Sequence, residues 1–254
     1  MTQPEPRVTL EAFEAVGVRG VLHRPPVPNG DAFALTHGAG SNANAPLLVR
    51  MAAALAEAGY VVLRYDLPFR IERPKGPPVP PMAARDREGI ARAVDALRKL
   101  TPGRVFAGGH SYGGRQTAMA AAEHTELAAA LLLLSYPLHP PHKPEQMRIG
   151  FFPELRTPVL FVHGTADPFA TVEELRAAIT MIPAYTDLFV VEGAGHDLKN
   201  APAAARTFWS ASARWSAILR NNFPGSRPCA NTATRLPTEL RSPAQPPRAI
   251  TKKG

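Results

Sequence analysis

Hydrophobic residues follow two alternating periods along the chain. Short apolar runs rich in β-branched residues predict strands, and stretches with apolar residues three or four positions apart predict helices. Strands are expected in residues 8–13, 17–23, 31–38, 60–67, 103–109, 128–137, 158–167 and 187–196. Helices are expected in residues 46–59, 83–100, 114–124, 171–179 and 205–221. This alternation, with near-continuous apolar strands, indicates an α/β fold with a mostly parallel central sheet and helices on both faces.

Three further features of the fold can be predicted from this pattern. Residues 8–13 and 17–23 are short strands that are expected to form an N-terminal hairpin. Residues 68–81 and 136–144 are rich in proline and are expected to be loops that follow strand ends. Only the segment 137–156 separates the sixth predicted strand from the seventh, which predicts a long loop and no cap domain.

Charge is distributed unevenly along the chain. The formal net charge is +8, but residues 220–254 hold seven basic residues and one acidic residue. Residues 1–219 therefore hold 22 basic and 20 acidic residues, and we expect them to form one nearly neutral domain. Residues 220–254 also contain six prolines and no apolar periodicity, which predicts a basic, Pro-rich, disordered tail. The near-neutral domain argues against nucleic acid as a partner.

Neither a membrane segment nor a secretory signal is predicted. The first twenty residues lack a long apolar run. The longest wholly apolar stretch, residues 127–134, has eight residues, which is too short to span a bilayer. The chain has one cysteine, Cys229, so it cannot form an intrachain disulfide. These observations favour a cytoplasmic protein without membrane partners.

The pentapeptide GHSYG, residues 109–113, matches the G-x-S-x-G pattern of a nucleophile elbow. It lies between a predicted strand and a predicted helix. Such a sharp turn needs small neighbours, and the glycines two positions before and two positions after Ser111 meet that need. The start of the helix also favours negative charge near the serine. We therefore expect Ser111 to be a nucleophile.

A serine nucleophile needs a base to take its proton and an acid to orient that base. Around such an elbow the expected order is Ser, then Asp or Glu, then His, each on a loop after a strand. Asp167 ends the segment 158–167 and His196 ends the segment 187–196, so we expect Asp167 to be the acid and His196 the base. Asp66, at the end of an earlier strand, is an alternative acid.

An acyl-transfer site also needs N–H donors for the developing oxyanion. The backbone N–H of Tyr112 is one expected donor, and that of Ala39, on the loop after strand 31–38, is the other. Gly40 is an alternative donor and a candidate substrate contact. Arg115 lies in the first turn of the helix after the serine, where the helix dipole disfavours a cation. It is a candidate for binding a substrate carboxylate or an acidic partner; the alternative is an arginine that reaches solvent or a nearby acid.

Other side chains are expected to have structural roles. His110 is expected to pack away from the site. His139 and His142 lack a third ligand nearby, so no metal site is expected. The chain has no phosphate-binding glycine motif, and no cofactor is expected. The aromatic residues expected to supply apolar contacts to an open site are Phe69, Tyr136, Phe151, Phe152 and Phe169.

Four segments together resemble the α/β-hydrolase superfamily: THGAGSN (36–42), GGHSYGGRQ (108–116), HGTADPF (163–169) and GAGHDL (193–198). They look most like the small, lid-poor branch near dienelactone hydrolase. The segment SYPLHPPHKPEQMR (135–148) is similar to one in hydrolase-like proteins related to a subunit of a eukaryotic histone-acetyltransferase complex. The likeness covers about residues 7–219 and implies an α/β-hydrolase fold, with Ser111 as nucleophile, Asp167 as acid and His196 as base. Dienelactone hydrolase uses a cysteine nucleophile, so its lactone specificity is not carried over.

The sequence therefore predicts a serine hydrolase of the carboxylesterase type that cleaves small esters or thioesters through an acyl-enzyme. Its site is expected to be open, with walls from residues 67–81 and 137–152, which suits short acyl groups better than long lipids. One alternative is a hydrolase-fold binding or scaffold protein with little turnover. Another is a peptidase or acyltransferase that uses the same residues.

Overall fold

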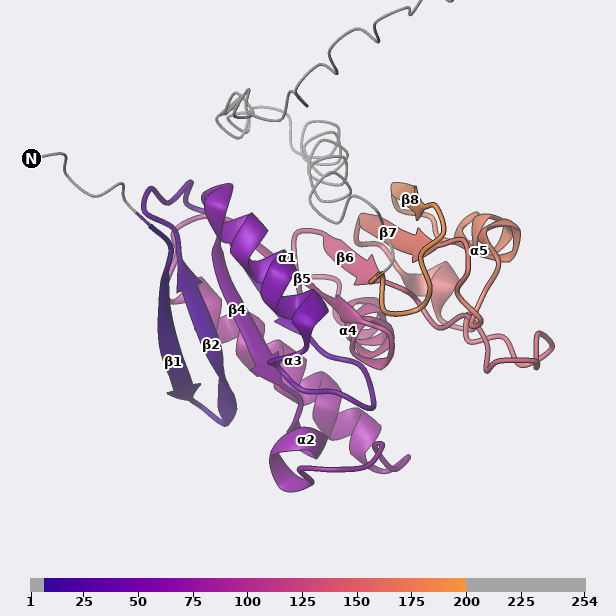
Figure 1. The fold of residues 1–254 in the computed structure, drawn as a ribbon, viewed down its shortest axis with the longest axis horizontal. Coiled ribbons are helices and arrows are strands. Elements are labelled where there is room, and N and C mark those ends of the chain that lie inside the picture. The colour runs from indigo at the N-terminus through magenta and orange to yellow at the C-terminus, as the bar shows by residue number, and fades with distance from the viewer. Residues whose placement is uncertain (1–6, 200–254) are drawn as a thin grey trace, which may run out of the picture.

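An eight-stranded sheet runs through the centre of the computed structural model, which describes residues 7–199 (Figure 1). Its strands are β1 (Thr9–Ala15), β2 (Val18–Arg24), β3 (Ala32–Thr36), β4 (Val61–Asp66), β5 (Val105–His110), β6 (Leu131–Leu134), β7 (Val159–Gly164) and β8 (Thr186–Val191). They are ordered β1-β2-β4-β3-β5-β6-β7-β8 across the sheet. The β1–β2 and β2–β4 pairs are antiparallel and all the others are parallel. The predicted N-terminal hairpin and mostly parallel sheet are confirmed.

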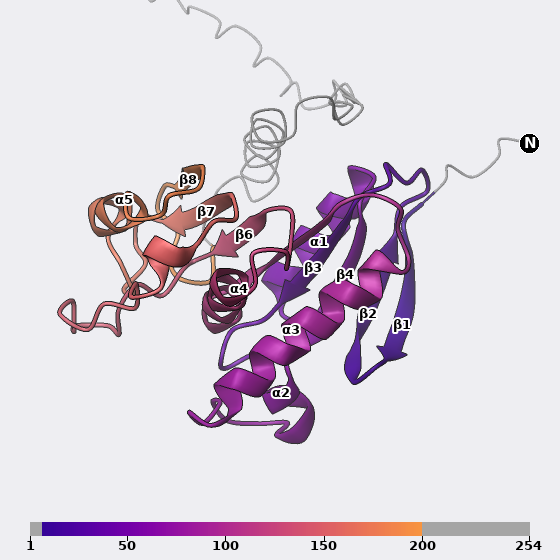
Figure 2. The same cartoon turned by 180° about the vertical axis from the view of Figure 1, so that it is seen from behind.

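Helices cover both faces of this sheet, as predicted. They are α1 (Pro46–Glu57), α2 (Pro68–Glu72), α3 (Met82–Arg98), α4 (Tyr112–Glu123) and α5 (Val172–Ile179), with a 3-10 turn, η1 (Phe152–Glu154). α1 covers the face seen in Figure 1, and α3 and α4 cover the face seen in Figure 2. Successive side chains of a strand point to opposite faces. Phe33 and Leu35 of β3 therefore join the core with α1, whereas Ala32 and Ala34 join the core with α3 and α4.

One proline-rich segment differs from its prediction. Residues 68–81 were expected to be a loop, but they begin with the short helix α2. Pro68 lies in the first turn of that helix, where its missing N–H is not needed. The buried Asp86 carboxylate on α3 accepts a hydrogen bond from the Phe69 amide at 3.0 Å, which satisfies another free donor of that turn. The predicted helix 205–221 and the predicted tail 220–254 lie outside the described residues.

Parallel strands bring their carboxyl ends to one edge of the sheet, and ligand sites of open α/β sheets lie at such an edge. The loops after β3, β5, β7 and β8 meet there. The connection between β6 and β7 contains η1, and no separate cap domain is present in residues 7–199. No helix in this part of the chain is long and apolar enough to cross a membrane.

Candidate active site

Ser111 lies at the sharp turn between β5 and α4. Its backbone has φ 51° and ψ −118°, in a region that non-glycine residues rarely adopt and that often marks functional sites. The backbone around it is tightly packed. A Cβ on Gly109 would lie 2.6 Å from the Thr36 carbonyl oxygen, and one on Gly113 would lie 2.4 Å from the His37 carbonyl oxygen. Glycine is therefore required on both sides of the serine because any side chain would collide with the end of β3 or the residue after it.

Ser111, His196 and Asp167 form a continuous hydrogen-bonded chain. His196 Nε2 lies 2.8 Å from Ser111 Oγ. His196 Nδ1 lies 2.8 Å and 3.0 Å from the two carboxylate oxygens of Asp167. Because a carboxylate only accepts hydrogen bonds, Nδ1 carries the proton, and Nε2 is left to accept one from the serine hydroxyl. The loops after three different strands thus bring the three predicted residues together.

The Asp167 side chain is fully buried behind His196. Burial by itself would raise its pKa, but the hydrogen bond and charge of His196, together with the Phe169 amide that donates at 2.9 Å, hold the pKa below its usual value. The carboxylate is therefore ionised at neutral pH, which is the form that orients an imidazole. Asp66, the alternative acid, instead accepts from the Ala43 amide at 2.7 Å and pairs with Arg19 at 3.2 Å.

Two aromatic side chains hold His196 in place. The ring of Phe169, predicted only as an apolar contact, lies against the imidazole with the ring centroids 4.2 Å apart. His110 Nε2 donates to the His196 carbonyl oxygen at 2.8 Å, and the two imidazole centroids are 5.0 Å apart. His110 therefore packs against its neighbours as predicted, but the prediction that it points away from the site is wrong, because it lies beside the base. Burial is the main cause that lowers the pKa of His110 to about 4, so it stays neutral beside the base.

The loop that follows β3 lies directly against the elbow. A Cβ on Gly38 would be 3.4 Å from the Ser111 Cβ. Gly38 is therefore in contact with the nucleophile, and Ala39 and Gly40 are the next two residues of the chain. Tyr112 is the first residue of α4, and its N–H has no acceptor within the helix. Its hydroxyl donates to the Asp86 carboxylate at 2.7 Å. The two predicted donors, Ala39 and Tyr112, are thus chain neighbours of Gly38, which lies against the serine, and of Ser111 itself.

Arg70 on α2 binds the backbone of the loop that follows β3. Its buried guanidinium donates to the carbonyl oxygens of Ser41 at 2.7 Å and Ala39 at 2.8 Å. It also donates to the carbonyl oxygens of Arg73 and Gly76, each at 3.0 Å. A planar guanidinium suits this task because its several donors are fixed in one plane. Sequence reasoning missed Arg70 because it lies in no motif and in a segment predicted to be a loop.

The remaining predicted contact residues lie in different environments. Gly40 is exposed, and a Cβ there would meet no atom within 4 Å, so the loop is open at this position. Arg115 is half-buried on α4. Among the aromatic residues expected to line an open site, only Phe151 and Phe169 are partly exposed. The prediction is wrong for three side chains that are core residues: Phe69, Tyr136 and Phe152.

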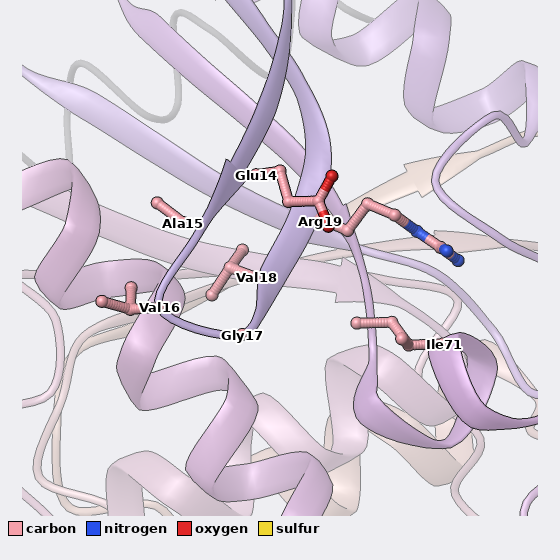
Figure 3. A pocket seen from close by; sticks show the side chains of 7 residues that line it. All are labelled: Glu14, Ala15, Val16, Gly17, Val18, Arg19 and Ile71. Atoms are coloured by element: carbon pink, nitrogen blue, oxygen red, sulfur yellow. The ribbon is translucent and has the colours of Figure 1, made fainter.

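A separate pocket of about 340 Å³ opens between the turn of the β1–β2 hairpin and α2 (Figure 3). Its lining residues are Glu14, Ala15, Val16, Gly17, Val18, Arg19 and Ile71. None of them is a predicted site residue, so this pocket is distinct from the serine site. Within residues 7–199 no three His, Cys, Asp or Glu side chains gather in a way that could hold a metal ion.

Comparison with known proteins identifies a sequence family that this chain matches and solved structures that share its fold. The sequence model of a family described as an alpha/beta hydrolase domain matches residues 29–220. The structure is similar to dienelactone hydrolase from Anabaena variabilis, with a TM-score of 0.66 and 22% identity over 82% of this chain and 96% of that chain.

Two further solved structures are similar. An alpha-beta serine hydrolase homologue from Coxiella burnetii has a TM-score of 0.59 and 16% identity over 84% of this chain and 96% of that chain. The esterase domain of a Rhodothermus marinus protein has a TM-score of 0.59 and 17% identity over 83% of this chain and 98% of that chain. At these identities the structural likeness shows the fold.

Proposed function

We propose that this chain, which belongs to the alpha/beta hydrolase domain family, is a serine hydrolase that cleaves small ester or thioester substrates through an acyl-enzyme. One observation carries the proposal: Ser111 Oγ, the His196 imidazole and the Asp167 carboxylate are joined by hydrogen bonds of 2.8 Å at each step. The strained backbone at the serine adds support, since such strain is kept where function needs it.

In the proposed acylation step, Ser111 Oγ attacks the carbonyl carbon of the ester while His196 Nε2 takes the hydroxyl proton. The carbonyl oxygen becomes an oxyanion, which the N–H groups of Tyr112 and Ala39 stabilise. The ionised Asp167 stabilises the positive imidazolium. His196 then gives the proton to the leaving alcohol or thiol as its bond to the carbonyl carbon breaks.

Deacylation repeats these roles with water as the nucleophile. His196 Nε2 takes a proton from water, the resulting hydroxide attacks the acyl-enzyme, and Ser111 leaves with that proton returned by His196. The products are a carboxylic acid and free enzyme. No other group is needed, because the base, the acid and the N–H donors all come from the chain.

The proposed substrates are small because no separate cap domain covers the site within residues 7–199. A long acyl chain would have little apolar surface to bind, since Phe69 and Phe152 are buried in the core. In a chain-length series of p-nitrophenyl esters, short acyl groups should therefore give the highest kcat/KM. A maximum at laurate or longer would contradict this preference.

The proposed function is tested by reaction with a fluorophosphonate, which phosphonylates activated serines. We expect one adduct by intact mass, mapped by peptide sequencing to Ser111, together with hydrolysis of p-nitrophenyl butyrate. Heat-denatured protein is the control for non-specific labelling. Absence of both adduct and hydrolysis in a folded protein would contradict the proposal and favour a hydrolase-fold binding module.

Arg70→Lys is expected to lower kcat for ester hydrolysis by about tenfold to hundredfold with little change in KM. Lysine keeps the charge but cannot hold the carbonyls of Ala39 and Ser41 together, so the proposed oxyanion donor shifts. Steady-state kinetics would measure the effect, and thermal unfolding would report on stability. Arg85→Lys, which alters only an exposed ion pair with Glu72, is the control. Equal kcat losses in both variants, or a change confined to KM, would argue against this positioning role.

A further inference from the structure

The Tyr136 hydroxyl contacts two arginines: the backbone of Arg148, on the loop after β6, and the side chain of Arg115, on α4. The Tyr136 hydroxyl donates to the Arg148 carbonyl oxygen at 2.6 Å. The same hydroxyl is hydrogen-bonded to the Arg115 guanidinium. The pKa of Arg148 is lowered, first by burial and then by the charge of Arg115. The two positive charges are therefore close enough to repel each other in a partly buried setting.

Neither guanidinium has an acidic partner within residues 7–199. Arg115 Nε is buried there without a hydrogen-bond partner, and Arg148 Nη1 makes only a long contact of 3.4 Å with the Pro137 carbonyl oxygen. A buried donor without a partner is costly, and repulsion between the two cations adds to that cost. An anion bound beside both half-buried guanidinium groups would offset the repulsion between them.

The acids of the neighbouring elements do not supply that anion. Glu123, farther along α4, pairs with Arg87 at 2.8 Å. Asp86 on α3 accepts from the Phe69 amide and the Tyr112 hydroxyl. Glu145 on the loop 136–149 and Glu154 on η1 are both exposed, and neither forms an ion pair with the described residues. The arginine pair is thus open to an anion from outside the chain.

The pair also lies beside the serine. The Arg115 amide donates to the Ser111 carbonyl oxygen at 2.9 Å, one helical turn away. Arg115 therefore lies in the first turn of α4, which begins directly after its N-cap Ser111. The loop that carries Arg148 is tied to the base as well, because the His139 amide donates to the Phe169 carbonyl oxygen at 3.1 Å and the Phe169 ring lies on His196.

We propose that Arg115 and Arg148 form a carboxylate-binding subsite, so that the preferred substrates are esters with a second, ionised carboxylate a few bonds from the scissile carbonyl. This inference rests on the proposed function of Ser111. Guanidinium groups bind carboxylates through paired, charge-assisted hydrogen bonds, and two of them together select an anion strongly over a methyl group.

The test compares matched esters that differ only in this charge. Mono-p-nitrophenyl esters of adipic, pimelic and suberic acid are paired with p-nitrophenyl hexanoate, heptanoate and octanoate, in which a methyl replaces the carboxylate. A second arm places the charge on the alcohol side, with 4-(carboxymethyl)phenyl hexanoate against 4-ethylphenyl hexanoate. We expect the acidic ester to have about tenfold to hundredfold higher kcat/KM in at least one arm at constant ionic strength.

Substitution of both arginines links that preference to the subsite. The double variant Arg115→Gln Arg148→Gln should lose most of the acid-over-neutral ratio, whereas Arg50→Gln, an exposed arginine on α1, should keep it. Circular dichroism and thermal unfolding would show that the variants fold. Hydrolysis of neutral esters with no acid preference in either arm, or a preference that survives the double substitution, would overturn the subsite while leaving the proposed function intact.

A binding measurement separates the subsite from turnover. Titration of suberate into Ser111→Ala by calorimetry needs no hydrolysis, so it remains informative if the wild type neither labels nor hydrolyses esters. We expect suberate to bind Ser111→Ala, and its affinity to fall about tenfold or more when both arginines are also replaced by glutamine. No suberate binding, or equal binding with and without the arginines, would overturn the subsite.

Discussion

Ser111→Ala should lower kcat for ester hydrolysis by about a millionfold, the size of loss seen when the nucleophile of a serine triad is removed. The reason is that no acyl-enzyme can form, and His196 is left without the hydroxyl that lies 2.8 Å from its Nε2. Only the N–H donors and substrate binding would remain. Initial rates at high enzyme concentration, with the fluorophosphonate adduct measured by intact mass, would show both losses.

Ser135→Ala is a matched control for this substitution. Ser135 also has a left-handed backbone, with φ 49° against 51° for Ser111, and it follows the adjacent strand β6. It is buried, and its Oγ has no hydrogen-bond partner among the described residues. Its removal should leave kcat and labelling nearly unchanged. Residual activity of Ser111→Ala above about a hundredth of wild type would mean that another group is the nucleophile.

The strand, the sharp turn and the helix around Ser111 could be predicted from the sequence because each is signalled by residues close together in the chain. A β-branched run, a glycine turn and an alanine-rich helix follow one another within residues 103–124, and the structure has β5, Ser111 and α4 there. The chain order of Ser111, Asp167 and His196 was also readable, since each follows a strand whose apolar pattern is clear. Parallel strands then bring the three to one edge of the sheet.

The contacts that shape the site could not be read in the same way. Arg70 reaches the carbonyls of Ala39 and Ser41, about thirty positions earlier, through bonds to backbone atoms that leave no mark in residue type. The sequence predicts that His110 points away from the site, because the turn at the next residue is expected to direct it there, yet it bonds to the His196 backbone. Both contacts depend on how loops from different strands meet, which sequence periodicity does not encode.

Buried aromatic residues illustrate the same limit. Phe69, Tyr136 and Phe152 follow strands or lie in proline-rich loops, which favoured a place at the rim of the site. In the structure Phe69 lies on α2, Tyr136 follows β6 and Phe152 lies on η1, and all three side chains join the core that α3 and α4 cover. Burying such large apolar groups stabilises the loops themselves. Of the five aromatic residues predicted at the site, Phe151 and Phe169 stay partly exposed, and Phe169 lies against His196.

Asp167→Asn should lower kcat by about ten-thousandfold at neutral pH while leaving the fold intact. The carboxylate holds the proton of His196 on Nδ1 through contacts of 2.8 Å and 3.0 Å. An asparagine can turn its NH2 group toward Nδ1 and so favour the tautomer with the proton on Nε2, which cannot accept one from Ser111. Steady-state kinetics with p-nitrophenyl butyrate, with thermal unfolding alongside, would measure this effect.

Two neighbouring acids provide the comparison. Asp197 adjoins His196 but pairs with Lys199 at 2.7 Å, so Asp197→Asn should change kcat little. Asp66→Asn tests the alternative acid and should affect stability, through its bond to the Ala43 amide, more than kcat. A thousandfold loss in Asp66→Asn with near-normal rates in Asp167→Asn would reassign the acid.

The contacts of Asp167 with His196 also predict how activity depends on pH and how the substitutions of Ser111 and Asp167 combine. The pKa of Asp167 is held below its usual value, so loss of activity at neutral or mildly acidic pH should not come from its protonation. Because Asp167 acts only through His196 on Ser111, adding Asp167→Asn to Ser111→Ala should cost almost nothing further. An additional loss of a hundredfold or more would mean that Asp167 acts on the reaction by a route that does not pass through the serine.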